Sequence, residues 1–271
     1  MRLPEKYCCL TGFHLKLIAL ASMMIDHFGA IVVLELYQVA IYPAIWPEAV
    51  WLQTLLRSLS ENLQGLITVY DTLRIIGRMA FPIYCFLLVE GFVHTRNPAR
   101  YALRLLLFAL LSEIPFDLAF QETPLEFTNN NVFFTLLTGL LLIWSISLPE
   151  HWLQSRPWPR PVRWLLYGFS AAVLTAVFCF VTHKWICPDY EAYGVLIIAV
   201  MYVLRRFPVP AFCVSTLILA TLNPIELYAL FMCIPVALYN GQRGKPVKLL
   251  FYLFYPLHLL LYWLLTCFLS A

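Results

Sequence analysis

The chain has 271 residues, of which 62% are hydrophobic and only 12% are charged, and its mean hydropathy is +0.78. Soluble domains contain about 45–50% apolar and about 25% charged residues, so this composition excludes an ordinary soluble domain and indicates a polytopic membrane protein. The net charge of +3 comes without a basic tract, which argues against a nucleic-acid partner. The eight cysteines show no metal-ligand spacing, so we expect buried thiols and no metal site.

Apolar runs long enough to cross a bilayer, which takes about 20 helical residues, recur along the whole sequence. They predict an all-α transmembrane helical bundle of about nine spans (eight to ten), forming one domain over residues 1–271. No cleavable signal is evident, and the seventh and eighth spans are two tilted spans or a re-entrant pair. The predicted limits are Phe13–Leu36, Leu73–Val93, Tyr101–Phe120, Asn131–Leu148, Trp164–Thr182, Tyr190–Leu204, Ala211–Leu222, Ile225–Tyr239 and Leu249–Leu269.

Connections rich in Lys and Arg alternate with connections that carry few. The basic groups lie at the N-terminus and after the second, fourth, sixth and eighth predicted spans. By the positive-inside rule, these segments face the cytoplasm, so we expect a cytoplasmic N-terminus and an external C-terminus. The arginines after the second span, Arg96, Arg100 and Arg104, either reach lipid headgroups or bind a ligand phosphate.

The longest connection covers about residues 41–72. Trp51, Leu52, Leu55 and further leucines recur in it at helical spacing, which predicts an amphipathic helix on the outer interface. Such a helix could cover an outward-facing cavity, or it could be a simple interfacial connection.

The first predicted span carries an acid and a histidine side by side, Asp26 and His27, near its midpoint. One ionisable side chain at the centre of a membrane helix costs roughly 2.5–3.5 kcal/mol on insertion scales. The pair is therefore expected to face a protein interior or a water-filled cavity, and it indicates a functional site. A carboxylate beside an imidazole could also fix the tautomer of that imidazole or raise its basicity.

Other ionisable residues fall at comparable depth in their predicted spans. Arg78 could neutralise Glu113 or Asp117, which share a helix face, either as an ion pair that locks two helices or in contact with substrate. His258 in the last span could meet the pair formed by Asp26 and His27. Three prolines within spans, Pro82, Pro115 and Pro256, bend their helices and lie close to these polar residues. They favour a cavity formed by the first, second, third and ninth spans.

Several separate motifs of the sequence resemble the TraX family, which is similar to the polytopic acyltransferases of the acyltransferase 3 type. The resemblance is collinear over nearly the whole chain. The motifs lie at Leu15–Ala19, Met24–Gly29, Arg74–Ile83, Glu90–Asn97, Arg104 with Leu111–Asp117, Asn130–Leu136, Asp189–Leu196 and Tyr255–Leu259.

The resemblance implies an integral-membrane acetyltransferase of the bacterial cytoplasmic (inner) membrane that uses acetyl-CoA. The named activity of the family is acetylation of pilin N-termini, and the acceptor here could be a protein N-terminus, a glycan or a lipid. We expect His27 to act as general base or acetyl carrier with Asp26 orienting it, and His258 or Arg78 to stabilise the oxyanion. The expected acceptor contacts are Glu113, Asp117, Asn130, Asn131 and Tyr255, and the expected acetyl-CoA contacts are Arg96, Arg100 and Arg104.

Two other classes of function stay open from the sequence. A transporter or proton-coupled carrier also uses ionisable residues in mid-membrane, although the chain shows no repeated half, which many such transporters have. A scaffold subunit of an envelope complex would leave the adjacent acid and histidine unexplained.

Overall fold

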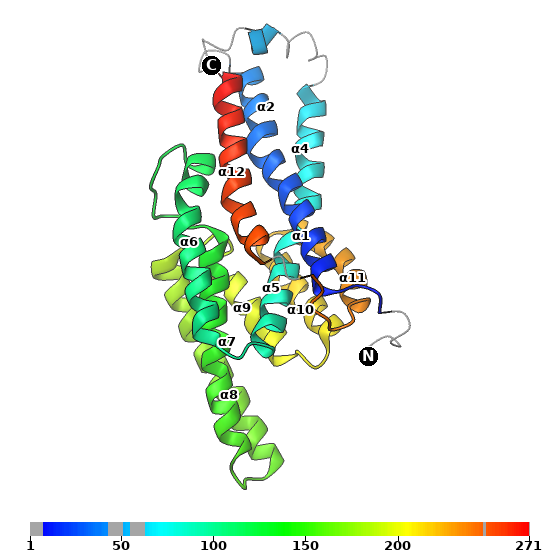
Figure 1. Ribbon diagram of the computed structural model, residues 1–271, viewed down its shortest axis with the longest axis vertical. Coiled ribbons are helices and arrows are strands. Elements are labelled where there is room, and N and C mark those ends of the chain that lie inside the picture. The colour runs from blue at the N-terminus through cyan, green and yellow to red at the C-terminus, as the bar shows by residue number, and fades with distance from the viewer. Residues whose placement is uncertain (1–7, 43–50, 55–62, 246–247, 271) are drawn as a thin grey trace.

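The computed structural model describes residues 8–42, 51–54, 63–245 and 248–270, and these residues form helices joined by short connections (Figure 1). In chain order the helices are α1 (Gly12–His27), the π-helical η2 (Phe28–Val33), α2 (Leu34–Ile41), α4 (Leu63–Gly77), α5 (Ala80–Val93), α6 (Pro98–Phe120), α7 (Val132–Gln154), α8 (Arg160–Val181), the π-helical η4 (Thr182–Ile186), α9 (Glu191–Val203), α10 (Pro208–Leu222), the 3₁₀-helical η5 (Pro224–Met232), α11 (Cys233–Ala237) and α12 (Lys248–Ser270).

The all-α transmembrane prediction is confirmed at the level of helices long and apolar enough to cross a membrane. Among the described residues, five stretches qualify: Gly12–Ile41, Gly65–Val93, Val132–Gln154, Arg160–Ile186 and Phe251–Leu269. Three shorter apolar helices occupy Glu191–Val203, Pro208–Leu222 and Pro224–Ala237. Every predicted span overlaps a helical segment, whereas the number of spans, the single domain and the side of the N-terminus stay predictions.

Several helices extend beyond the approximate limits predicted for the spans, and in the first two spans apolar residues continue past those limits. The first span was expected to end at Leu36, but the helix runs on through Val39 to Ile41. The second was expected to begin at Leu73, yet α4 already begins at Leu63. Of the predicted interfacial helix at 41–72, residues 51–54 form one helical turn, and 43–50 and 55–62 lie outside the described residues. Leu52 in that turn is buried against Val39.

The second helix is interrupted where its proline predicts a bend. α4 ends at Gly77 and α5 begins at Ala80, so Arg78 and Met79 form the break. Pro82 lacks the N–H that would bond to the carbonyl of Arg78, four residues earlier, and the helix therefore cannot continue regularly through this point. The break places Arg78 at the junction of two helices, where its side chain can turn inward.

The helices gather in two overlapping groups along the long axis of the molecule. Figure 1 shows α2, α4 and the end of α12 together at one end, while α7 and α8 form a hairpin that extends to the other end. α5, α9 and α10 pack between these groups, and the largest buried core cluster includes Ile83, Leu140, Ile198 and Phe212. α8 presents much of its apolar surface outward, with Leu165 73% exposed, as expected for a helix that faces lipid.

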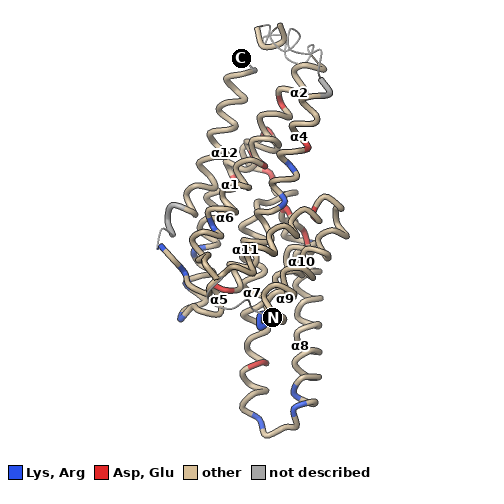
Figure 2. Tube along the Cα trace, turned by 90° about the vertical axis from the view of Figure 1, so that its right-hand side faces the viewer, with Lys and Arg blue, Asp and Glu red and all other residues tan. Residues whose placement is uncertain are grey.

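Charged residues distribute unevenly along this axis. Figure 2 shows the end with α2 and the end of α12 almost without Lys or Arg, whereas the connection of α7 to α8 carries several. The N-terminal segment pairs with the connection before α12, because Leu10 bridges to Tyr239 and the amide of Gly12 donates to the carbonyl of Gln242 at 2.8 Å. Asn130 lies in the connection between α6 and α7, and Pro188 lies in the connection between η4 and α9. An isolated β-bridge between these two residues joins the two connections.

Candidate active site

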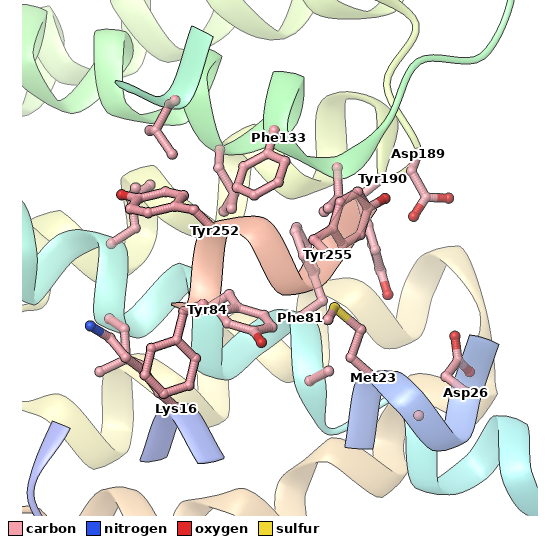
Figure 3. A pocket seen from close by; sticks show the side chains of 18 of the residues that line it. Lys16, Met23, Asp26, Phe81, Tyr84, Phe133, Asp189, Tyr190, Tyr252 and Tyr255 are labelled. Carbon is pink, nitrogen blue, oxygen red and sulfur yellow. The ribbon is translucent and has the colours of Figure 1, made fainter. Parts of the chain in front are cut away.

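A cavity of about 760 Å³ runs through the middle of the helical bundle. Its lining includes Arg104 near the start of α6 and Phe120 at its end, which are about 24 Å apart at 1.5 Å per helical residue, so the cavity is elongated. Figure 3 shows this elongation, with Lys16 toward one end of the pocket and Asp26 and Asp189 toward the other. The volume lies within the range of about 300–1,000 Å³ typical of ligand sites.

His27 lines the cavity, as its position in the sequence predicts. It is the last residue of α1, directly before the π-helical segment η2, and such segments occur often at functional sites. Its Nδ1 lies 2.7 Å from Nε2 of His258 on α12, and the two ring planes differ by only 4°. The structure therefore brings together two histidines that are 231 residues apart in the sequence.

The hydrogen bonds of this histidine pair fix its tautomers. Nδ1 of His258 lies 2.8 Å from the carbonyl oxygen of Phe254, and a carbonyl can only accept, so this Nδ1 carries the proton. In the neutral ring Nε2 of His258 then accepts from Nδ1–H of His27. The remaining nitrogen of His27, Nε2, holds a lone pair, as a general base or a nucleophile requires.

Asp26 does not orient His27, which corrects the expected pairing. Its carboxylate accepts a hydrogen bond from Arg74 at 2.7 Å and two from Arg78 at 2.9 and 3.1 Å. Successive side chains on an α-helix point about 100° apart, so neighbours in sequence face different partners. Asp26 faces α4, whereas His27 faces α12.

Arg78 pairs with different acids from those expected. It joins Asp26 to Glu226 of η5, with a distance of 3.1 Å from its guanidinium to Oε1 of Glu226. The expected partners, Glu113 and Asp117, face α7 and the connection before it instead. Glu113 accepts from the side-chain amide of Asn131, and Asp117 accepts from the backbone amide of Glu126 at 2.8 Å.

The expected acceptor contacts divide into one cavity residue and four that support the structure. Tyr255 lines the cavity, whereas Glu113, Asp117, Asn130 and Asn131 are absent from its lining. Asn131 caps α7, since its side chain accepts from the amide of Phe133. The side chain of Asn130 donates to the carbonyl of Ile186 and so holds the connection before α9.

Basic side chains line the end of the cavity near the N-terminal segment. Of the expected acetyl-CoA contacts, Arg104 lines the cavity there, and Arg96 and Arg100 do not. Lys16 and Arg243 join it. The Nε atom of Arg104 is buried and has no hydrogen-bond partner among the described residues.

Comparisons with known proteins identify the family of this chain. The TraX protein family matches residues 12–266. The chain belongs to the TraX family. A protein of Dichelobacter nodosus described as probable fimbrial assembly protein FimC, serogroup H1, is 28% identical over 220 residues, which cover 71% of this chain and 82% of that protein. No solved structure matches the chain.

The sequence analysis of this TraX-family chain gave no role to several residues that line the cavity or belong to the ion-pair network around Arg78. Glu226 lies in an apolar run directly after Asn223 and Pro224, and its charge within a predicted span was the available signal. Arg74 and Asp189 line the cavity and occur in motifs that carry the resemblance, but neither received a role.

Proposed function

We propose that the protein is a membrane-embedded acetyltransferase of the bacterial inner membrane. It would move an acetyl group from acetyl-CoA to an amine or hydroxyl of a membrane-associated or extracytoplasmic acceptor. Membership of the TraX family and the relative named for fimbrial assembly support a pilin-related acceptor. The observation that carries the proposal is the lone pair on Nε2 of His27 within a cavity that has two chemically different ends.

The basic end of the cavity suits acetyl-CoA. Lys16, Arg104 and Arg243 would hold the polyanionic nucleotide part, while the activated thioester supplies the acetyl group. This end faces the cytoplasm under the positive-inside assignment, and cytoplasm is where acetyl-CoA occurs. Tyr84, Tyr252 and Tyr255 line the part beyond and would surround the less polar arm of the molecule.

His27 would act as the general base on the acceptor. Its Nε2 takes the proton of the attacking amine or hydroxyl, and the acceptor of its Nδ1–H, His258, stabilises the imidazolium that forms. His258 is absent from the cavity lining, so it acts through His27 as a positioning residue. Arg78 and Arg74 both line the cavity, whereas His258 does not. The side chain of Arg74 is 26% exposed and that of Arg78 is 12% exposed, so the oxyanion role expected for His258 or Arg78 falls more readily to Arg74.

The test is acetyl transfer by purified protein from radiolabelled acetyl-CoA. His27→Gln removes the base, and loss of a general base commonly lowers the rate by about 10²–10⁴-fold. His151→Gln is the matched control, because His151 is exposed near the end of α7 and lies outside the cavity. Equal consumption of acetyl-CoA by the parent and His27→Gln, or none by the parent, would contradict the proposal.

A further inference from the structure

Two thiols lie close together outside the cavity, in a part of the bundle that acetyl transfer does not use. Sγ of Cys213, on α10, lies 3.1 Å from Sγ of Cys233, the first residue of α11. Neither cysteine lines the cavity, and both are free and partly exposed. A disulfide bond is about 2 Å long, so a shift of about 1 Å would bring the two sulfur atoms within bonding distance.

The thiol pair borders a surface that suits contact with lipid. Leu217, one helical turn after Cys213, is 51% exposed, and Ile234, next to Cys233, is 63% exposed. The only charged residue of α10, η5 and α11 is Glu226, which is buried. Polar solutes are costly to place in such surroundings, so a reagent that reaches the two thiols from this side has to be soluble in lipid.

The basic connections place the same pair near the cytoplasmic ends of its helices. α10 begins at Pro208, two residues after Arg206, and Arg243 follows the end of α11. Under the positive-inside assignment, Cys213 is about 8 Å from the cytoplasmic end of α10. Cytoplasmic reductants keep thiols reduced, so the pair lies between these reductants and any oxidant dissolved in the membrane.

A bond between the two thiols would hold the segment that supplies Glu226 to the ion-pair network. Cys233 directly follows η5, which is 3₁₀-helical over nine residues. Runs of 3₁₀-helix longer than about three or four residues are uncommon, because their hydrogen-bond geometry is poor. η5 packs on α10 (Figure 1), and its Glu226 accepts a hydrogen bond from the guanidinium of Arg78. A disulfide from Cys213 to Cys233 closes the loop of residues 213–233 and so opposes detachment of η5 from α10.

We propose that Cys213 and Cys233 form a redox-sensitive modification site, which a membrane quinone oxidises to a disulfide. Both S–H bonds break and one S–S bond forms, while two electrons and two protons pass to the quinone, which becomes the hydroquinone. Cytoplasmic thiols reverse the change by two thiol–disulfide exchanges, in which the reductant is itself oxidised to a disulfide. The oxidised protein holds η5 on α10 more firmly than the reduced protein does. The inference does not depend on the proposed acetyl transfer.

Treatment of the purified protein in detergent with decylubiquinone tests the site. Every ring position of this quinone is substituted, so it accepts electrons without alkylating thiols. After the remaining thiols are blocked, peptide mass spectrometry should find Cys213 linked to Cys233, and dithiothreitol should remove the link. Oxidation should raise Tm by roughly 5 °C, as expected for a disulfide that closes a loop of this length. Absence of the linked peptide, or a linked peptide without a rise in Tm, would overturn the inference.

Single substitutions show whether the response belongs to this pair. Cys213→Ser and Cys233→Ser should each lose the rise in Tm, measured against the same variant in dithiothreitol, so that the effect of the substitution itself cancels. Cys179→Ser is the matched control and should respond as the parent does, because Cys179 lies on α8 and donates to the carbonyl of Ala192. Diamide, a water-soluble thiol oxidant, should form the link more slowly than the quinone at equal concentration. Equal or faster reaction with diamide, or a rise in Tm that survives either substitution in the pair, contradicts the proposed site.

Discussion

Gly77 offers the sharpest test of how the ion-pair network is built. It is the last residue of α4 and packs against α1, where Oγ of Ser22 donates to the carbonyls of Ile76 and Gly77 at 2.5 and 3.3 Å. A Cβ atom on Gly77 would overlap Oδ1, Cγ and Cβ of Asp26. Rotation of the carboxylate cannot move Cβ of Asp26, so α1 and α4 would have to separate.

The expected cost of Gly77→Ala follows from two terms. Overpacking of a filled interior costs about 1–3 kcal/mol. Loss of one partner from a buried ion pair costs about 3–5 kcal/mol, and this term enters to the extent that Asp26 leaves Arg74 and Arg78. Alanine in place of glycine within a helix otherwise stabilises by about 0.5–1 kcal/mol, which is below the middle of the range of either term.

Gly168→Ala is the matched control for this substitution. Gly168 lies within α8, and a Cβ atom there meets nothing within 4 Å. Thermal unfolding of both variants in the same detergent should show a clear decrease in Tm for Gly77→Ala and an equal or slightly higher Tm for Gly168→Ala. Acetyl transfer should fall only in Gly77→Ala. Indistinguishable unfolding of the two variants would refute the close packing of α1 on α4.

Three further substitutions test other parts of the site. His258→Asn should lower kcat while leaving KM for acetyl-CoA near the parent value, because the lost group only positions the base; a change confined to KM would contradict that role. Arg104→Gln should raise KM for acetyl-CoA about tenfold, whereas Arg100→Gln should leave it unchanged, because Arg100 lies outside the cavity lining. Equal effects of the two substitutions would refute the assignment of acetyl-CoA to the basic end of the cavity. Glu150→Ala should lower Tm without altering either KM, since it removes the partner of Arg205 at the base of α7; unchanged unfolding would argue against this ion pair.

The helices were predictable because long apolar runs leave the backbone few alternatives in a membrane. Pro82 removes a specific hydrogen bond, which accounts for the interruption at Arg78. Helix ends were less predictable: α4 begins ten residues before the expected Leu73, because moderate apolarity near Leu66 continues the helix. Hydropathy decides where a helix can exist more reliably than where it stops.

The members of the candidate site were partly predictable, and their partners were not. The depth of Asp26 and His27 was readable from their place in an apolar run. Their partners depend on the rotation of α1 about its axis and on which helices pack against it, which spacing along one chain does not determine. Glu226 was missed for the same reason, since only the packing of η5 against the break in α4 brings it to Arg78.

Asp26 affects the position of His27 because the two residues are adjacent on α1, although their side chains do not bond. Arg74 and Arg78 hold Asp26 from α4, and Arg78 is held in turn by Glu226. These bonds fix the rotation of α1 one residue before His27, on a different face of the helix. With that rotation fixed, His27 is directed toward α12, where His258 sets its tautomer. The network thus positions His27 through the backbone of α1.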